Sequence, residues 1–435
     1  MNRSEQCSTR IGLKSIKICF EQCICICAPC FLQTYSLEMR FLNNCVLLTL
    51  FLAVVATTYG QAIKLDDAIR KGLKPLSIAI ESRDTNVLST ARRAFRLHGG
   101  YSLEAVPQPA YTFSINSTGS SSVSLVIFSG KPAQELYRRK VSGRDLQDAV
   151  LRACDIAVEA TLQTKGFFAG KLAYVRKLQG VAEIYTSSLL FDKFKALTAD
   201  KAHVTSPDWS PDGTKIVYTT YYKSGFPDIY MQDLNSNRRI AIANFNGTNA
   251  SPEFSPSGRQ IAMSLSGKGV SNIFVADVNG KNLRPITRTK SIETSPSWSP
   301  DGRMLVLVSD MPGKPQIYEV SASGGSVRRL PTNVSGNCSE PVWNPVDKNL
   351  IAFTAAFSGG FQIVVYDRRA EKSEILTRVP GSAVEPEWLS DGRHLVFTHK
   401  NNGKKRLMIL DSKTKKISAL HTSDFGETSS ATFVY

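Results

Sequence analysis

Ser206-Pro-Asp-Trp-Ser-Pro-Asp-Gly213 is the first of five closely related stretches in this chain. The others are Ser251-Pro-Glu-Phe-Ser-Pro-Ser-Gly258, Ser295-Pro-Ser-Trp-Ser-Pro-Asp-Gly302, Glu340-Pro-Val-Trp-Asn-Pro345 and Glu385-Pro-Glu-Trp-Leu-Ser-Asp-Gly392. Their aromatic residues return every 44 or 45 positions. A period of this length, with several short strands in each unit, is typical of a β-propeller.

Each repeat contains the ingredients of four antiparallel strands. The aromatic residue is followed by a turn signal, usually Asp-Gly, and then by an apolar triplet such as Ile216-Val217-Tyr218. Asp-Gly between apolar runs favours a hairpin because both residues tolerate positive φ. A third strand such as Asp228-Ile229-Tyr230 and a more polar fourth run complete the unit. Val346-Asp347 replaces Asp-Gly in the fourth repeat, where we expect a different turn.

The ends of the repeat region predict how the ring closes. Residues 171–198 match the second, third and fourth strands of a repeat but lack an aromatic first strand. Phe433 lies 45 residues after Trp388, where the missing strand would fall. Because open sheet edges promote aggregation, a C-terminal strand that completes the first blade is favoured. We therefore predict a six-bladed β-propeller over residues 165–435.

The first 61 residues read as targeting sequence rather than as part of the fold. Residues 39–61 combine Met39-Arg40, a short apolar core and a small-residue exit, which is the pattern of a secretory signal peptide. A membrane anchor is the alternative, but the apolar run is shorter than the roughly 20 residues that span a bilayer. Residues 1–38 precede this signal, and we interpret them as an extension from a start assigned too early. They hold six of the nine cysteines, without regular zinc-ligand spacing.

Residues 62–164 predict a small α/β domain ahead of the ring. Strands are expected at 76–80, 101–106, 110–115, 123–128 and 135–141. Helices are expected at 87–97, with Thr85 or Asn86 as N-cap, and from about 143 to 164. The mature part keeps Cys154 and Cys338, which we expect as buried thiols, with a disulfide as the alternative in an oxidising compartment.

The mature part is strongly basic. The chain holds 53 Lys and Arg against 37 Asp and Glu, of which five basic and three acidic residues precede residue 61, so the remainder carries a net charge of +14. Such a charge favours anionic partners, but the charges are spread over many loops, which favours a solvated, Lys-rich exterior instead. Arg-rich motifs with interleaved aromatic residues are absent from the sequence, and the export signal argues against nucleic acid.

The sequence contains no catalytic or cofactor motif that we could identify. It has no Gly-x-Ser-x-Gly elbow and no phosphate-cradling Gly loop, so neither a hydrolase nor a nucleotide-binding enzyme is indicated. We expect no cofactor, no metal and no catalytic residues. The histidines show no metal-ligand spacing; they are His98, His203, His394, His399 and His421.

These features together resemble the TolB family of the Tol-Pal system of Gram-negative bacteria. The resemblance rests on the Ser/Glu-Pro-x-Trp-Ser-Pro-Asp-Gly units, the Ile-Tyr or Ile-Phe third strands, the Gly166-Phe167 lead-in, the signal peptide and the preceding α/β domain. It is specific over residues 165–435 and loose over 63–164. The resemblance implies a periplasmic, non-enzymatic adaptor that supports outer-membrane invagination at cell division and outer-membrane integrity.

The resemblance also implies partners and contact residues. Members of the family bind the peptidoglycan-associated lipoprotein Pal at the open end of the channel, and through it lie peripheral to the outer membrane. They also contact the inner-membrane protein TolA through the mature N-terminus, here about Ala62 to Leu73, whose wording departs from the family pattern. The Pal-contacting positions fall on Thr248, Ser251 and Thr294, and we expect Ser251 and Thr294 in loops ahead of the buried aromatic rather than in the strands. Repeat symmetry adds Ser206, Ser295, Glu340 and Glu385, each three residues before its aromatic, although each could instead only cap a turn.

Two other functions fit the same sequence. One is a propeller that gates or assists a periplasmic peptidase, and the other is a propeller that binds a glycan or peptidoglycan directly. Propellers host many functions, so the fold alone does not decide among them. Partner identification from an envelope extract separates the three.

Overall fold

The computed structural model describes residues 73–103, 107–267 and 269–435. Three predicted features lie outside the described residues: the N-terminal extension, the signal peptide and the expected TolA segment, of which only Leu73 is described. None of the helices in the described ranges is long and apolar enough to cross a membrane.

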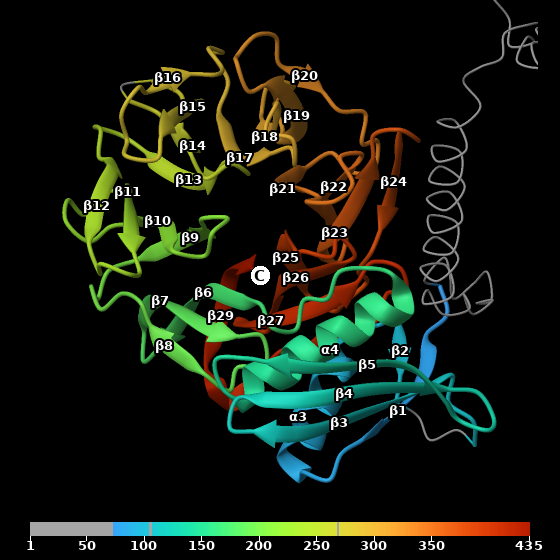
Figure 1. Cartoon of the computed structure of the whole chain (residues 1–435). Helices are drawn as coiled ribbons and strands as arrows, with labels where there is room; N and C mark the ends of the chain where they lie inside the picture. Colours follow the sequence, from blue (N-terminus) through green and yellow to red (C-terminus); the bar gives the residue numbers. More distant parts are fainter. Residues whose placement is uncertain (1–72, 104–106, 268) are drawn as a thin grey trace, which may run out of the picture. The chain divides into compact units, whose positions relative to one another are not determined.

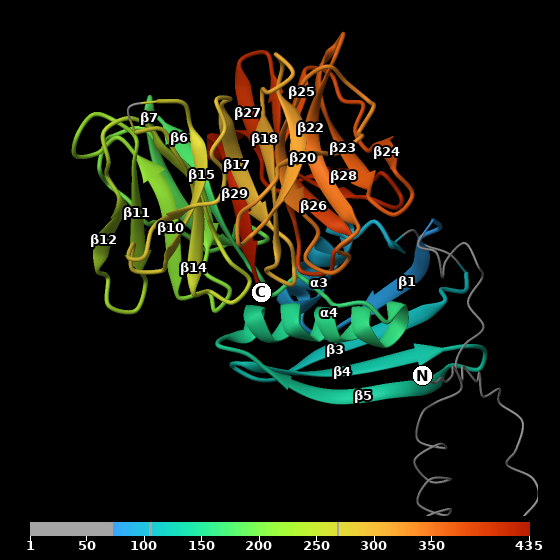
Figure 2. The ribbon, with the colours of Figure 1, turned by 90° about the horizontal axis from the view of Figure 1, so that it is seen from above.

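An α/β domain comes first along the described chain. Its five-stranded sheet has the order β2-β1-β3-β4-β5, with β1 parallel to both neighbours and the remaining pairs antiparallel. Helices α3 and α4 lie on one face of this sheet (Figure 2). The elements are β1 Leu76–Glu81, α3 Thr85–Leu97, β2 Tyr101–Ser102, β3 Tyr111–Gly119, β4 Ser122–Ser129, β5 Gln134–Ser142 and α4 Leu146–Leu162.

Helix α3 begins differently from the sequence prediction. Its N-cap is Asp84, whose carboxylate accepts hydrogen bonds from the backbone N–H groups of Asn86 and Val87. Thr85 and Asn86, the expected caps, are already part of the helix or its first turn. A carboxylate at the N-cap also interacts favourably with the positive end of the helix dipole, which explains why Asp84 rather than Thr85 or Asn86 is the cap.

Six four-stranded antiparallel sheets then surround a central channel (Figure 1). We number the blades 1 to 6 in chain order, and strands 1 to 4 of each blade from the channel outward. The six-bladed prediction is confirmed. Blade 1 is β29 Glu427–Val434, β6 Lys171–Leu178, β7 Val181–Ser188 and β8 Phe194–Ala196; blade 2 is β9 Val204–Trp209, β10 Lys215–Thr220, β11 Asp228–Asp233 and β12 Arg239–Ala243; blade 3 is β13 Asn249–Phe254, β14 Gln260–Leu265, β15 Asn272–Asp277 and β16 Arg284–Pro285. Blade 4 is β17 Glu293–Trp298, β18 Met304–Ser309, β19 Gln316–Ser321 and β20 Arg328–Arg329; blade 5 is β21 Cys338–Trp343, β22 Leu350–Phe357, β23 Gly360–Asp367 and β24 Lys372–Ile375; blade 6 is β25 Ser382–Trp388, β26 His394–Asn401, β27 Lys404–Asp411 and β28 Ile417–Ala419, followed by the short helix η1 Ser423–Phe425.

The C-terminal strand closes the ring as the sequence predicted. Strand β29 pairs with β6, and Phe433 and Val434 stand opposite Leu172 and Lys171. Blade 1 is therefore built from the two ends of the propeller sequence. This pairing covers a sheet edge that would otherwise be open.

Every innermost strand carries the same irregularity. A β-bulge interrupts its pairing with strand 2, and the residue three positions before the aromatic has a left-handed backbone with φ of 50–56°. The sequence predicts Ser251 and Thr294 in loops ahead of the strands, but Ser251 lies inside β13 and Thr294 inside β17. The bulge explains the difference, because it lets the strand begin earlier while it bends along the channel. The bulge residues are Ser206, Ser251, Ser295, Glu340, Glu385 and Ser430.

Blade 5 has the altered turn that its sequence predicted. Elsewhere the first hairpin uses a glycine of positive φ, such as Gly213. In blade 5 the Asn344 side chain instead accepts the N–H groups of Val346 and Asp347 at 2.9 and 2.8 Å. A side-chain amide thus replaces the glycine turn.

The repeated aromatic residues pack between blades. Trp298 is 5 % exposed and lies in a core cluster with Ala262, Ile273 and Val275 of the preceding blade. The largest core joins the α/β domain to blades 1 and 6, since it contains Phe95 of α3, Leu172 of β6 and Val396 of β26. Cys154 and Cys338 are buried free thiols.

Candidate functional site: the propeller channel

The channel contains a cavity of about 320 Å³ at the centre of the ring. Residues from the bulge to just before the aromatic line it in five blades, and Ser295 and Pro296 line it in blade 4, so the repeat itself builds the wall. Many of these residues are polar, and several are acidic. Five of the predicted contact residues are part of the lining: Ser206, Ser251, Ser295, Glu340 and Glu385.

Side chains on the channel wall join each blade to the next. The residue immediately before the aromatic accepts the backbone N–H of the next blade's aromatic residue. Asp208 accepts from Phe254 at 2.7 Å, and Glu253 accepts from Trp298 at 2.8 Å. The Ser297 hydroxyl accepts from Trp343 at 3.1 Å. Hydrogen bonds of this kind satisfy amides that strand pairing leaves free.

The joint between blades 5 and 6 has another form. Val342 occupies the position before Trp343 and has no side-chain acceptor. Three residues before Trp343, the Glu340 carboxylate accepts the N–H of Glu385 at 2.8 Å. The bulge residue therefore provides the joint that Val342 does not.

The C-terminal strand completes the series of joints. Glu385 accepts the N–H of Ser430 at 2.9 Å, and Glu387 accepts that of Phe433 at 3.4 Å. The Thr432 hydroxyl donates to Asp208 at 3.1 Å, which joins blade 1 to blade 2. All six blade junctions are thus bridged by a channel side chain.

Three of these carboxyl groups have strongly altered acidities. Burial raises the pKa of Asp208 to about 7 and that of Glu387 to about 8, the latter helped by the nearby Asp208. Burial and the Asp208 charge also raise the pKa of Glu253 well above its ordinary value. Like charges that face one another across a narrow space disfavour joint ionisation. These carboxyl groups therefore keep their protons to higher pH than ordinary Asp and Glu side chains do.

The other predicted contact residues lie near the channel mouth. Thr248 is exposed, just before β13, and its N–H donates to Ser266 at 2.7 Å. Thr294 is half-buried in β17, opposite Val308. Glu340 and Glu385 have internal partners, since Thr354 and Thr398 donate to them at 2.6 and 2.7 Å. Glu340 and Glu385 thus lie in strand bulges, with their carboxylates engaged inside the propeller.

One end of the propeller is rich in exposed apolar side chains. We call this end, formed by the loops from strand 2 to strand 3 and from strand 4 to the next blade, the rim face. Phe226 is 68 % exposed there, and Ile292 is 51 % exposed. Clustered apolar side chains on a surface commonly mark a protein interface. The exposed apolar residues of the rim face are Leu178, Val181, Tyr222, Phe226, Phe245, Val270, Ile292 and Met311.

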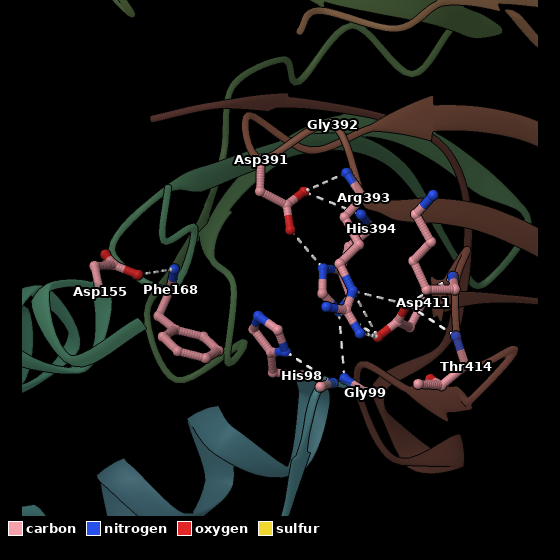
Figure 3. A network of polar contacts seen from close by, with 12 residues as sticks. His98, Gly99, Asp155, Phe168, Asp391, Gly392, Arg393, His394, Asp411 and Thr414 are labelled. Atoms are coloured by element: carbon pink, nitrogen blue, oxygen red, sulfur yellow. Dashed lines mark hydrogen bonds and ion pairs between the residues drawn. The ribbon is translucent and has the colours of Figure 1, made fainter. Parts of the chain in front are cut away.

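Sequence reasoning missed a polar cluster at the opposite end of the propeller (Figure 3). His98, which follows α3, meets Asp391 and His394 of blade 6, with ligand atoms within 4.8 Å of one another. His394 Nδ1 lies 2.5 Å from Asp391 Oδ2, and Arg393 forms a 2.7 Å ion pair with Asp411. A separation of almost 300 residues hides this grouping from any spacing rule.

In this cluster each imidazole ring already accepts a hydrogen bond at one of its nitrogens. The Gly100 N–H donates to His98 Nδ1 at 3.0 Å, and the Gly99 N–H donates to His394 Nε2 at 3.3 Å. A neutral imidazole has one acceptor nitrogen and one N–H, so these contacts place the proton of His394 on Nδ1, which faces Asp391, and that of His98 on Nε2, which has no hydrogen-bond partner among the described residues. That arrangement suits hydrogen bonding rather than metal coordination.

Comparison with known proteins agrees with the repeat pattern. The family described as the TolB beta propeller domain matches residues 158–432. The Tol-Pal system protein TolB of Alcanivorax borkumensis is 32 % identical over 142 residues, which cover 32 % of each chain. The protein of the same name from Francisella tularensis subsp. tularensis is 35 % identical over 115 residues, covering 25 % of this chain and 26 % of the relative. The chain thus matches about a third or less of the length of these relatives.

A solved structure extends the likeness of fold to the α/β domain. The crystal structure of TolB from Acinetobacter baumannii superposes with a TM-score of 0.74 and 23 % identity, covering 83 % of this chain and 97 % of that one. At this identity the likeness concerns the fold. Since the family match covers more than half of the sequence, the chain belongs to the TolB β-propeller family.

Proposed function

We propose that this chain is a non-enzymatic adaptor of a Tol-Pal system that binds a Pal-like peptidoglycan-associated lipoprotein on the rim face. The observation that carries the proposal is the concentration of exposed apolar side chains around the channel mouth of a TolB-family propeller. Protein interfaces combine such apolar anchors with a polar surround. The polar channel lining and the apolar loops together offer both.

The distribution of these side chains favours one side of the ring. Exposed apolar residues occur on the rim face of blades 1 to 4, whereas the exposed Val346 of blade 5 lies at the opposite end. Thr248 and Thr294, two of the family positions, follow the exposed Phe245 and Ile292 closely in sequence. We therefore place the centre of the lipoprotein contact over blades 2 to 4.

The remaining parts of the proposal rest on family membership. The relatives named above are Tol-Pal system proteins, which supports a periplasmic location, a role in outer-membrane invagination and integrity, and a function as an adaptor rather than an enzyme. Contact with a TolA-like inner-membrane protein through residues 62–73 belongs to the same proposal.

Calorimetric titration of the purified chain with the soluble domain of a Pal-like lipoprotein tests the rim face. Phe245→Ser removes an apolar anchor, and Thr248→Trp places a bulky ring on an exposed loop at the mouth. A central contact contributes about 1.4 kcal/mol or more, so each change should weaken binding roughly tenfold or more.

Matched controls use the opposite end of the ring. Val346→Ser removes an apolar side chain that is 60 % exposed, against 49 % for Phe245, and Asn235→Trp adds a ring to an exposed turn. Both variants should bind as tightly as the parent. If the rim-face variants also keep full affinity, the lipoprotein binds elsewhere; if peptidoglycan fragments bind and the lipoprotein does not, the glycan-binding function is correct instead.

A further inference from the structure

The contact between the α/β domain and blade 6 contains two histidines that the proposed function does not use. His98 and His394 are both fully buried, and their ring centroids lie 4.3 Å apart (Figure 3). Phe167 packs against both rings, at 5.5 and 4.6 Å between centroids. Titratable groups buried at a contact link its formation to proton uptake.

Two consecutive backbone amides of the α/β domain depend on these rings. The Gly99 N–H donates across the contact to His394 Nε2, and the Gly100 N–H donates to His98 Nδ1. An imidazole nitrogen accepts a hydrogen bond only while it is unprotonated. Both bonds therefore require neutral rings.

The geometry gives His394 an alternative partner within its own blade. Its Nε2 lies 3.3 Å from the Gly99 nitrogen and 3.4 Å from Asp411 Oδ2. A protonated Nε2 would donate to Asp411 and would face the Gly99 N–H as a second donor. Proton uptake thus exchanges a contact between the two domains for one inside blade 6.

Charged groups of blade 6 surround the pair. His98 faces His394, Arg393, Asp411 and Lys416, and burial together with the cationic neighbours holds its pKa well below the usual value. His394 is also desolvated, but Asp391 and Asp411 raise its pKa above the usual value. From the α/β domain, Tyr101 packs against His98 at 4.9 Å between centroids.

We propose that His98 and His394 form a proton-sensitive latch that holds the α/β domain on blade 6 when both rings are neutral and releases it on acidification. The fit at this contact is close, because a Cβ at Gly99 would lie 2.3 Å from Asp411 Oδ2. Such a contact has little room to adjust when an acceptor becomes a donor.

Both histidines change the docking equilibrium in the same direction. Docking lowers the pKa of His98 from its ordinary value of about 6.5, so its contribution is complete above that pH and declines as the pH falls. Undocking frees His394 from burial and from the Gly99 amide, both of which disfavour the cation, while Asp391 and Asp411 remain. Its pKa is therefore higher in the undocked state, and acid favours release there too.

Hydrogen exchange of the whole chain, corrected for intrinsic exchange rates, tests the latch. We expect the protection of the peptide that contains Gly99 and Gly100 to fall roughly tenfold or more between about pH 8 and about pH 5.5, since each linked proton changes the equilibrium tenfold per pH unit. Peptides from the centre of blade 4, such as residues 305–308, should stay protected, which excludes global unfolding.

Variants that retain an acceptor but cannot titrate provide the control. In His98→Asn and His394→Gln the amide oxygen can take the place of Nδ1 and Nε2, respectively. The double variant should lose less than about twofold protection over the same range, whereas His203→Asn, at an exposed histidine, should behave like the parent. Constant protection in the parent would overturn the latch, and so would an equal loss in the parent and the double variant.

Discussion

The Tyr435 hydroxyl donates a 3.0 Å hydrogen bond to the Asp155 carboxylate, which joins the residue after strand β29 to helix α4. Asp155 also accepts the backbone N–H groups of Phe168 and Ala169 at 2.7 and 3.0 Å. Helix α4, the segment that follows it and the distant end of the chain therefore meet at one carboxylate that is 2 % exposed.

Asp155→Ala should be strongly destabilising, because it leaves three donors without an acceptor. Each buried unsatisfied group costs about 1–3 kcal/mol, and the two backbone amides are the donors that would be left so, since Tyr435 is 58 % exposed; we therefore expect a loss of roughly 2 kcal/mol or more in the free energy of unfolding. Tyr435→Phe removes one bond and should cost about 1 kcal/mol. Denaturant unfolding measures both, and equal effects of the two changes would contradict the shared role of Asp155.

Deletion of residues 432–435 should open blade 1. It removes the pairs Phe433–Leu172 and Val434–Lys171 and the bond from Thr432 to Asp208. Lost burial of this extent costs about 3 kcal/mol or more, which should lower the thermal midpoint clearly. Removal of Tyr435 alone is the control, and an unchanged midpoint in the longer deletion would exclude closure by β29.

Trp298→Ala should destabilise the ring without a direct effect on the rim face. The indole is 5 % exposed between blades, and its truncation leaves a cavity that costs roughly 3–5 kcal/mol. Thr248→Trp on the rim face should change the unfolding free energy by less than about 0.5 kcal/mol. Calorimetric unfolding measures both free energies. If Thr248→Trp destabilised the protein more than Trp298→Ala, the assignment of Trp298 to the core and Thr248 to the rim face would be wrong.

The channel carboxyl groups predict a loss of stability as the pH rises. The pKa values of Asp208 and Glu387, about 7 and about 8, lie above those of unfolded carboxyl groups. The folded state then binds more protons than the unfolded state, so this contribution is largest at low pH and declines from about pH 4 to about pH 8. One pKa unit corresponds to about 1.4 kcal/mol.

Amide variants isolate this effect from other titrations. Glu387→Gln should reduce the decline in unfolding free energy with pH, measured in denaturant between about pH 5 and about pH 8. Glu374→Gln, at an exposed side chain, is the matched control. The assignment fails if both variants keep the slope of the parent.

Gly99→Ala should weaken docking of the α/β domain at every pH. Its Cβ would lie 2.5 Å from Asp411 Cβ, and real Cβ atoms are not found at that distance. Gly336→Ala is the control, because a Cβ at Gly336 meets nothing within 4 Å. Hydrogen exchange of α3 should increase in the first variant alone, and unchanged exchange in both would show that the contact is not tight.

The sequence predicted those parts of the molecule that recur or that depend on local chemistry. The aromatic period predicted six blades, and the 45-residue step to Phe433 predicted that the C-terminal strand completes blade 1. The strand bulges were missed because φ at Ser251 is set by pairing with the next strand, not by the residue itself. The contacts of His98 with His394 and of Asp155 with Tyr435 arise only when distant segments pack together.

The six joints along the channel wall also bear on how the ring comes apart. A linear array of repeats can fray from its outer units, because each end has only one neighbour. Here the bond from Thr432 to Asp208 and the pairing of β29 with β6 give every blade two neighbours. No blade is terminal, so the first to detach breaks two joints at once. We expect the propeller to unfold as one cooperative unit rather than blade by blade.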